Sequence, residues 1–147
     1  MVKQLISNSI LWTTIAGWAI AQALKIFIGV VRKRKFDFSW FITTGGMPSS
    51  HAAGVSTLAT CIGISQGFAS PLFALAAIFA FITMFDAQTS RRSVGVQARI
   101  LNNIMDDIYF GRKINEKKLK ELIGHTPVEV FVGMLIGILV AYTFYHK

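Results

Sequence analysis

Three long apolar runs limit what this chain can fold into more than any other feature. The first extends from Leu5 to Val31, the second from Phe68 to Phe85 and the third from Val128 to Tyr145. Lys25 is the one charged residue of the first run. A helix that crosses a bilayer needs about 20 predominantly apolar residues, and each run is long enough or nearly so. The runs therefore predict transmembrane helices.

A fourth segment, from His51 to Gly67, lies between the first two runs and is rich in Ala, Gly, Ser and Thr. Small residues of this kind allow helices to approach one another closely inside a membrane. The segment therefore predicts a fourth span, for which a re-entrant helix is the rival interpretation. The chain has 147 residues, of which 53% are hydrophobic. We expect one all-α domain over 1–147, a polytopic bundle of about four transmembrane helices.

The polar region before the last run carries a further helical pattern. Charged and amide residues separate its apolar residues, which recur at helical spacing as Ile100, Leu101, Ile104, Met105 and Ile108. Such a pattern indicates an amphipathic interfacial helix that lies on the membrane surface or against the bundle.

The basic residues are concentrated between the apolar runs, in Arg32–Lys35 and from Arg91 to Lys120, and the net charge is +8. Nucleic-acid binding would explain such a charge, but basic clusters beside spans more commonly orient a membrane protein and contact anionic headgroups. In a four-span chain, only Lys3 and Lys147 of the 15 Lys and Arg fall on the side of the termini. Because cytoplasmic loops carry the excess of Lys and Arg, we predict a cell-membrane protein with cytoplasmic basic loops and both termini outside.

A compact motif, Gly-Gly-Met-Pro-Ser-Ser-His-Ala-Ala, covers Gly45–Ala53 before the second span. Ser and Pro suit the start of a helix, and the free N–H groups and positive dipole end of a helix start bind phosphate. Ser49 and Ser50 are therefore candidate phosphate-binding residues. His51 stands where it can donate a proton to a leaving oxygen. The alternative is a capped helix with an incidental histidine.

A second motif opens the last span. On a helix, His125 and Glu129 stand one turn apart and can face each other. A carboxylate bonded to one ring nitrogen would fix the tautomer and raise the nucleophilicity of the other nitrogen. A carboxylate near a membrane boundary is costly without a partner, which favours a functional role for Glu129. The alternative is a structural cap pair.

Two further places bring positive charge close to a membrane face. Lys25 and Arg32 are seven residues, about two turns, apart on one helix face. Both could serve as interfacial anchors, or they could hold a phosphate through a point charge and a fork of donors. Arg91 and Arg92 follow the second apolar run, where they either anchor the span or close a phosphate pocket.

Together these motifs resemble the type 2 phosphatidic acid phosphatase superfamily, which includes lipid phosphate phosphatases and vanadium haloperoxidases. Its pattern has a lysine seven residues before an arginine, then Pro-Ser-Gly-His, then Ser-Arg and His-x-x-x-Asp. The matching residues here are Lys25 and Arg32, Pro48-Ser49-Ser50-His51, Ser90-Arg91, and His125 with Glu129. Ser50 and Glu129 replace the usual glycine and aspartate. More than thirty residues separate Arg91 from His125, where the superfamily places them close together. The chain looks like a short, divergent branch.

This resemblance implies that His125 attacks phosphorus to form a phosphohistidine, while His51 protonates the leaving alcohol and Glu129 orients His125. The residues expected to bind phosphate are Lys25, Arg32, Ser49, Ser50, Arg91 and Arg92. The superfamily's mechanism requires no metal, so we expect no cofactor. Its membrane members usually have about six spans, and formation of a homodimer is one way for a shorter chain to complete its packing.

The sequence thus favours an integral membrane lipid-phosphate phosphatase that hydrolyses a phosphomonoester or diphosphate, with a phosphorylated lipid and the bilayer as partners. One alternative is a non-catalytic membrane protein that binds or moves phosphorylated lipids with the same phosphate cradle. Another is a small transporter in which histidines and Glu129 relay protons.

Overall fold

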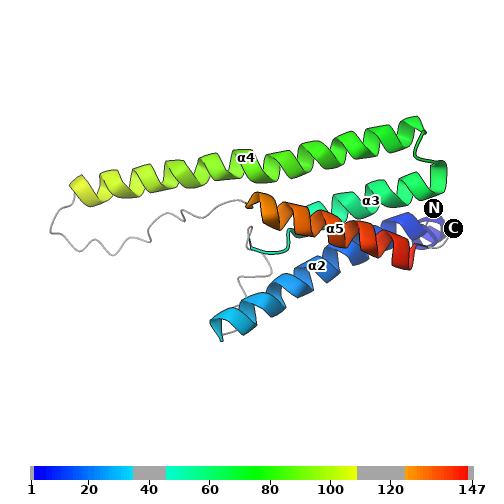
Figure 1. The fold of residues 1–147 in the computed structure, drawn as a ribbon, viewed down its shortest axis with the longest axis horizontal. Coiled ribbons are helices and arrows are strands. Elements are labelled where there is room, and N and C mark those ends of the chain that lie inside the picture. Colours follow the sequence, from blue (N-terminus) through cyan, green and yellow to red (C-terminus); the bar gives the residue numbers. More distant parts are fainter. Residues whose placement is uncertain (1, 35–45, 109–124, 146–147) are drawn as a thin grey trace.

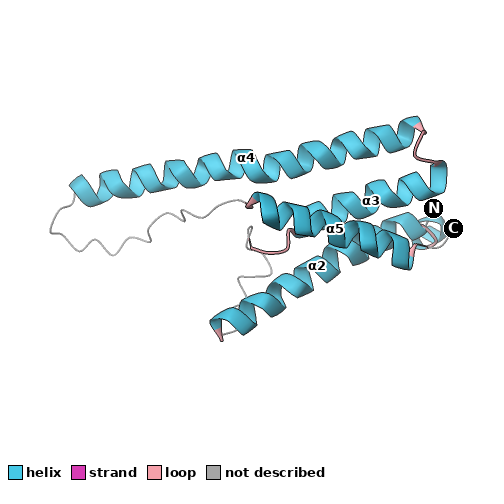
Figure 2. Ribbon diagram, in the orientation of Figure 1, coloured by secondary structure: helices cyan, strands magenta, loops and turns pink. Residues whose placement is uncertain are grey.

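The computed structural model describes residues 2–34, 46–108 and 125–145 (Figure 1). Side chains are described throughout these ranges except at 33, 90–94 and 106–108. The described residues form a short helix, α1 (Val2–Ile6), and four long ones. These are α2 (Ser9–Lys33), α3 (Ser50–Gln66), α4 (Pro71–Ile108) and α5 (Pro127–Phe144). Figure 2 shows helices and connecting loops but no strand in the described residues, which confirms the all-α prediction.

Three of the helices are long and apolar enough to cross a membrane, over Ser9–Arg32, Pro71–Thr89 and Pro127–Phe144. They correspond to the three apolar runs. Helix α3 has 17 residues and α5 has 18, so both are about 25 to 27 Å long. Since α3 lies within the bundle and is nearly as long as α5, it is the remaining helix of the predicted bundle of about four (Figure 1).

Helix α3 forms the centre of the bundle, where it packs against α2, α4 and α5, while α4 and α5 contact each other little. Its side chains are small, and the largest fully buried side chain among the described residues is that of Thr57. The buried residues of α3 are Ser50, Ala52, Ala53, Ser56, Thr57, Ala59, Thr60, Cys61 and Gly63. Small residues let helix backbones approach closely, and this is how helices associate where lipid removes the hydrophobic driving force.

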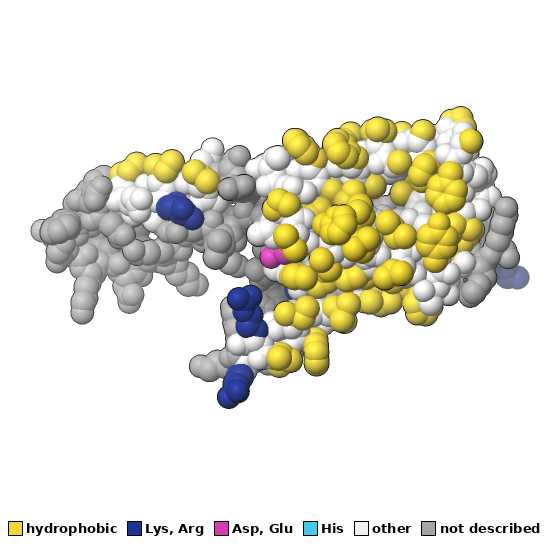
Figure 3. Space-filling view, in the orientation of Figure 1, with side chains coloured by type: hydrophobic (Ala, Val, Ile, Leu, Met, Phe, Trp, Pro, Cys, Tyr) yellow, Lys and Arg dark blue, Asp and Glu magenta, His cyan; other side chains and the backbone are white. Residues whose placement is uncertain are grey.

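The large apolar side chains lie on the outside of the bundle. Phe27 of α2, Leu75 of α4 and Leu139 of α5 expose 66%, 66% and 64% of their surfaces, values that would be costly in water. Figure 3 shows hydrophobic side chains over much of the visible face of the bundle, with Lys and Arg side chains toward its ends and most of the visible ones at the left. A small-residue interior and a large-residue exterior are what a bilayer requires.

The predicted amphipathic helix is helical, but it continues the third span without a break. Helix α4 has 38 residues and is therefore about 57 Å long, whereas the hydrocarbon core is about 30 Å thick. No proline occurs between Pro71 and Pro127, so nothing in the sequence stops the helix where its apolar run ends. Its second half therefore extends well past the start of α5 (Figure 1).

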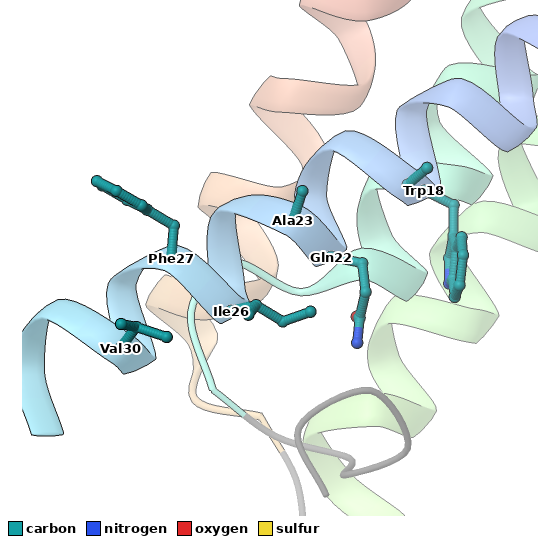
Figure 4. A pocket seen from close by; sticks show the side chains of 7 residues that line it. Trp18, Gln22, Ala23, Ile26, Phe27 and Val30 are labelled. Carbon is teal, nitrogen blue, oxygen red and sulfur yellow. The ribbon is translucent and has the colours of Figure 1, made fainter. Parts of the chain in front are cut away.

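Helix α2 carries a shallow apolar hollow of about 520 Å³. Figure 4 shows Trp18 toward one end of it and Phe27 and Val30 toward the other, with Ala23 between them. The residues that line it are Trp18, Ala19, Gln22, Ala23, Ile26, Phe27 and Val30. The hollow lies within the part of α2 that is apolar enough to cross a membrane.

Two glycines of α5 set its distance from α3. A methyl group at Gly133 would overlap the carbonyl oxygen of Ser49, and one at Gly137 would overlap that of Ala53. The hydroxyl of Thr57 lies within hydrogen-bond distance of the carbonyl oxygens of Gly137, at 3.0 Å, and Ala53, at 2.8 Å. Gly133 and Gly137 form a Gly-x-x-x-Gly pair, the spacing that brings membrane helices into backbone contact.

Substitution of these glycines should separate the two helices. We predict that Gly133→Ala and Gly137→Ala each destabilise the protein by about 1 to 3 kcal/mol, because the obstructing atoms are helix backbone that cannot rotate aside. Thermal unfolding of the purified variants in one detergent measures the effect. Gly54→Ala on α3 is the control, since its new methyl group would meet Trp18 Cβ at an ordinary 3.6 Å. Equal melting temperatures for all three variants would contradict the close α3–α5 contact.

Candidate functional site

Two hydrogen bonds tie together the end of the bundle where α3 and α5 begin. The N–H of Ser49, just before α3, donates to the carbonyl oxygen of Glu129 on α5 at 3.0 Å. The N–H of His125, just before α5, donates to the carbonyl oxygen of Ala87 on α4 at 3.1 Å. The starts of α3 and α5 are thereby fixed against each other and against the middle of α4.

The first turn of α5 is closed by a capping box. The hydroxyl oxygen of Thr126 accepts from the N–H of Glu129 at 3.3 Å, and Glu129 Oε2 accepts from the N–H of Thr126 at 2.9 Å. Pro127 follows at the first helical position, where its missing N–H is not needed. This arrangement satisfies two N–H groups at the helix start and fixes the carboxylate of Glu129 there.

The same carboxylate oxygen also lies beside His125. Glu129 Oε2 is 3.2 Å from His125 Nδ1, and His125 is only 4% exposed. An ionised carboxylate can only accept, so Nδ1 carries the proton in this pairing and Nε2 keeps its lone pair. Among the described residues, Nε2 of His125 is buried without a hydrogen-bond partner. A buried polar atom without a partner is uncommon in a folded protein, and a catalytic role, a water molecule or a bound ion is a common reason for one.

The surroundings of His125 favour its neutral form. Burial lowers the pKa of His125 below its usual value, and the positive charges of Lys25 and His51 act in the same direction. Glu129 opposes these effects through its hydrogen bond and its charge. A depressed pKa leaves the imidazole unprotonated at neutral pH, so its free nitrogen is available as a nucleophile.

The second histidine is close by and differs in exposure. His51 is the second residue of α3 and is exposed, and its ring centre lies 6.4 Å from that of His125 with the ring planes at 61°. The site therefore contains one buried and one exposed imidazole, which gives the two groups different access to water.

Lys25 brings a positive charge to the same place from α2. The Nζ of Lys25 lies 3.5 Å from the hydroxyl oxygen of Ser50, and Ser50 is only 2% exposed. The aliphatic part of the Lys25 side chain lies near Gly46. The hydroxyl oxygen of Ser49 accepts from the N–H of Ala52 at 3.3 Å and so caps α3. Ser49 thus contributes to the site by fixing the start of α3.

The predicted arginines are placed less directly. Arg32 is exposed and lies about 10.5 Å along the axis of α2 from Lys25. The side chains of Arg91 and Arg92 fall outside the described residues, although α4 runs through both positions. Arg91 is one turn beyond Ala87, whose carbonyl oxygen accepts from His125. The fold therefore brings the backbone near Arg91 close to His125 despite their separation in sequence.

The electrostatics of the site suit an anion. The starts of α3 and α5 face the same region, and each carries the positive end of a helix dipole. Within the described part of the chain, no three His, Cys, Asp or Glu side chains gather closely enough to hold a metal ion. The available groups are one buried and one exposed imidazole, a carboxylate and positive charge, and groups of these kinds can take part in phosphoryl transfer.

The sequence motifs did not identify the role of Thr126. The signal was present, because Thr-Pro-Val-Glu at 126–129 has the Thr-x-x-Glu pattern of a capping box. The contact between His125 and Ala87 had no such signal, since it joins residues from different helices.

Known proteins share sequence with most of this chain. Residues 6–140 match a family described as the divergent PAP2 family. The chain is also 45% identical over 149 residues to YuiD, an uncharacterized membrane protein of Bacillus subtilis (strain 168). That alignment covers 92% of this chain and 93% of the relative. No solved structure matches this chain.

Proposed function

The chain belongs to the divergent PAP2 family, as its motifs indicated, and on that premise we propose that it is an integral membrane lipid-phosphate phosphatase. Its location in a membrane follows from its three apolar helices and its membrane-protein relative. The observation that carries the proposal is Nε2 of His125, which is buried and has no hydrogen-bond partner among the described residues, with Glu129 on the opposite ring nitrogen and His51 beside it.

In the proposed first step, Nε2 of His125 attacks phosphorus and a phosphorus–nitrogen bond forms as the bond to the leaving oxygen breaks. The ring becomes positively charged in this step, and Glu129 stabilises that charge through Nδ1. The leaving oxygen takes a proton from His51. In the second step His51 removes a proton from water, which attacks phosphorus and releases His125.

The negative phosphoryl oxygens would be bound by the groups around the two histidines. Lys25, the hydroxyl of Ser50 and the first N–H groups of α3 are close to the described site. Arg32 and Arg91 would complete the cradle from α2 and α4, with Arg92 as the alternative to Arg91. Positive charge fixed around the transferring group is the main requirement of phosphoryl transfer.

The proposed substrate is a lipid because the site lies beside the hollow of α2. Lys25 is flanked along α2 by Gln22 and Ile26, two residues that line this hollow (Figure 4). A phosphate bound near Lys25 would therefore leave its attached chain next to an apolar surface at membrane depth. A phosphomonoester or a diphosphate of a lipid satisfies both features.

We predict that His125→Ala abolishes phosphate release, whereas His51→Ala loses about 10² to 10⁴-fold on ordinary substrates and much less on substrates with good leaving groups. The reason is that one histidine must form the covalent bond, while the other only assists departure. Phosphate release by purified protein, measured over a panel of lipid phosphates with and without a chelator, tests this.

His146→Ala serves as the control, because it removes the third histidine of the chain from outside both motifs. Unchanged hydrolysis in both site variants would exclude the proposed enzyme. Binding of lipid phosphates without any turnover by the unmodified protein would favour the non-catalytic alternative instead.

We also propose that the site faces the cytoplasm and that both termini lie outside. Figure 1 shows the two termini near one end of the bundle, away from the starts of α3 and α5. In the proposed four-span topology, ten of the 15 Lys and Arg residues fall on the site side even when Lys25, Arg32 and Arg91 are set aside, against Lys3 and Lys147 on the other. This bias favours a cytoplasmic site.

Cysteine labelling tests the orientation in a Cys61→Ala background. We predict that Lys117→Cys resists a membrane-impermeant thiol reagent in intact cells, while Lys147→Cys reacts, because the proposed four-span topology puts the two positions on opposite sides. Labelling after cell lysis is the control for access. The reverse pattern in intact cells would overturn the proposed orientation.

A further inference from the structure

We propose that Thr126 is a positioning residue whose capping box with Glu129 holds His125 in its reactive orientation. The inference deepens the proposed function and rests on it in one respect, namely that His125 is the nucleophile. A capping box ordinarily only stabilises the start of a helix. Here the box shares its carboxylate with the residue that would perform the chemistry.

Glu129 makes hydrogen bonds through both its side chain and its main chain. Glu129 Oε2 receives the N–H of Thr126 at 2.9 Å and lies 3.2 Å from His125 Nδ1. The N–H of Glu129 donates to the hydroxyl oxygen of Thr126 at 3.3 Å, and its carbonyl oxygen accepts from Ser49 at 3.0 Å. The main chain and side chain of Glu129 are thus both fixed, and through them the ring of His125 is fixed.

These two contacts of one carboxylate give a physical reason for glutamate at position 129, where the superfamily's pattern has aspartate. A carboxylate that closes a capping box must reach back one turn to the N–H of the N-cap residue, and Glu or Gln provides that reach. The same carboxylate must also meet His125 Nδ1. An aspartate is one methylene shorter, so we expect Glu129→Asp to keep the charge and lose one of the two contacts.

Thr126 acts on His125 only through Glu129. If its hydroxyl is removed, the N–H of Glu129 loses its acceptor and the first turn of α5 loosens. The carboxylate then spends less time beside Nδ1, and the positive charge that forms on the ring during attack is less stabilised. Loss of a partner that orients a metal-bound histidine typically lowers activity by about 10 to 100-fold, and we expect an effect of the same order here.

The pKa of His125 supplies a readout that does not depend on catalysis. The described groups that act on this pKa are Lys25 on α2, His51 on α3 and Glu129 on α5, and only Glu129 raises it. Loss of the carboxylate from its place should therefore lower the pKa of His125 further. A purely structural loss of stability would not shift the pKa in the folded protein in this direction.

The experiment compares Thr126→Val, which keeps the shape of the side chain but removes its acceptor, with Thr126→Ser, which keeps the acceptor. We predict that Thr126→Val lowers kcat about 10-fold or more with little change in KM, and lowers the pKa of His125 in nitrogen NMR of histidine-labelled protein. Thr126→Ser should leave kcat and the pKa of His125 close to those of the unmodified protein. Thr143→Val, the same change near the other end of α5, should alter neither.

An unchanged pKa of His125 and an unchanged kcat in Thr126→Val would overturn the inference, as would equal losses in Thr126→Ser. If the unmodified protein shows no turnover, the proposed function fails, but the NMR comparison still decides whether Thr126 and Glu129 control His125.

Discussion

The close contact between α3 and α5 is the constraint on which the rest of the structure depends. It exists because Gly133 and Gly137 present bare backbone to the carbonyl oxygens of Ser49 and Ala53. At this separation the N–H of Ser49 reaches Glu129, so the starts of the two helices meet. Each helix start carries one histidine, and the imidazole pair is a direct result of the packing beneath it.

The membrane setting explains why the packing takes this form. In lipid, burial of large apolar side chains gives little net stabilisation between helices, so the contacts depend on close backbone approach and a few hydrogen bonds. The interior is accordingly built from small residues of α3, with Thr57 bonded across to α5. Because these side chains are small, the helices are close enough for the polar residues around His125 to meet at one end of the bundle.

Much of this fold was predictable from the sequence. The length of an apolar run predicts a membrane-spanning helix, and a segment of small residues predicts close packing between helices. The pairing of His125 with Glu129 was also predictable, since a spacing of four residues places two side chains on one helix face. The continuity of α4 was not predictable, because an amphipathic pattern shows which face of a helix is apolar but not whether that helix is joined to the span before it. The approach of α4 to His125 depended on packing between distant segments, which no local pattern encodes.

The central claim is that His125 carries the phosphoryl group during turnover, and trapping that intermediate tests it most directly. Purified protein would be mixed with a radiolabelled lipid phosphate and quenched in alkali, since phosphohistidine is labile in acid, and the labelled peptide would be identified by mass spectrometry. The account predicts phosphate on His125. The level should be higher in His51→Ala when the substrate has a good leaving group, because the first step then proceeds without His51 and only the second step is slowed. Phosphate on any other residue, or turnover with no label on His125 in either protein, would contradict the account.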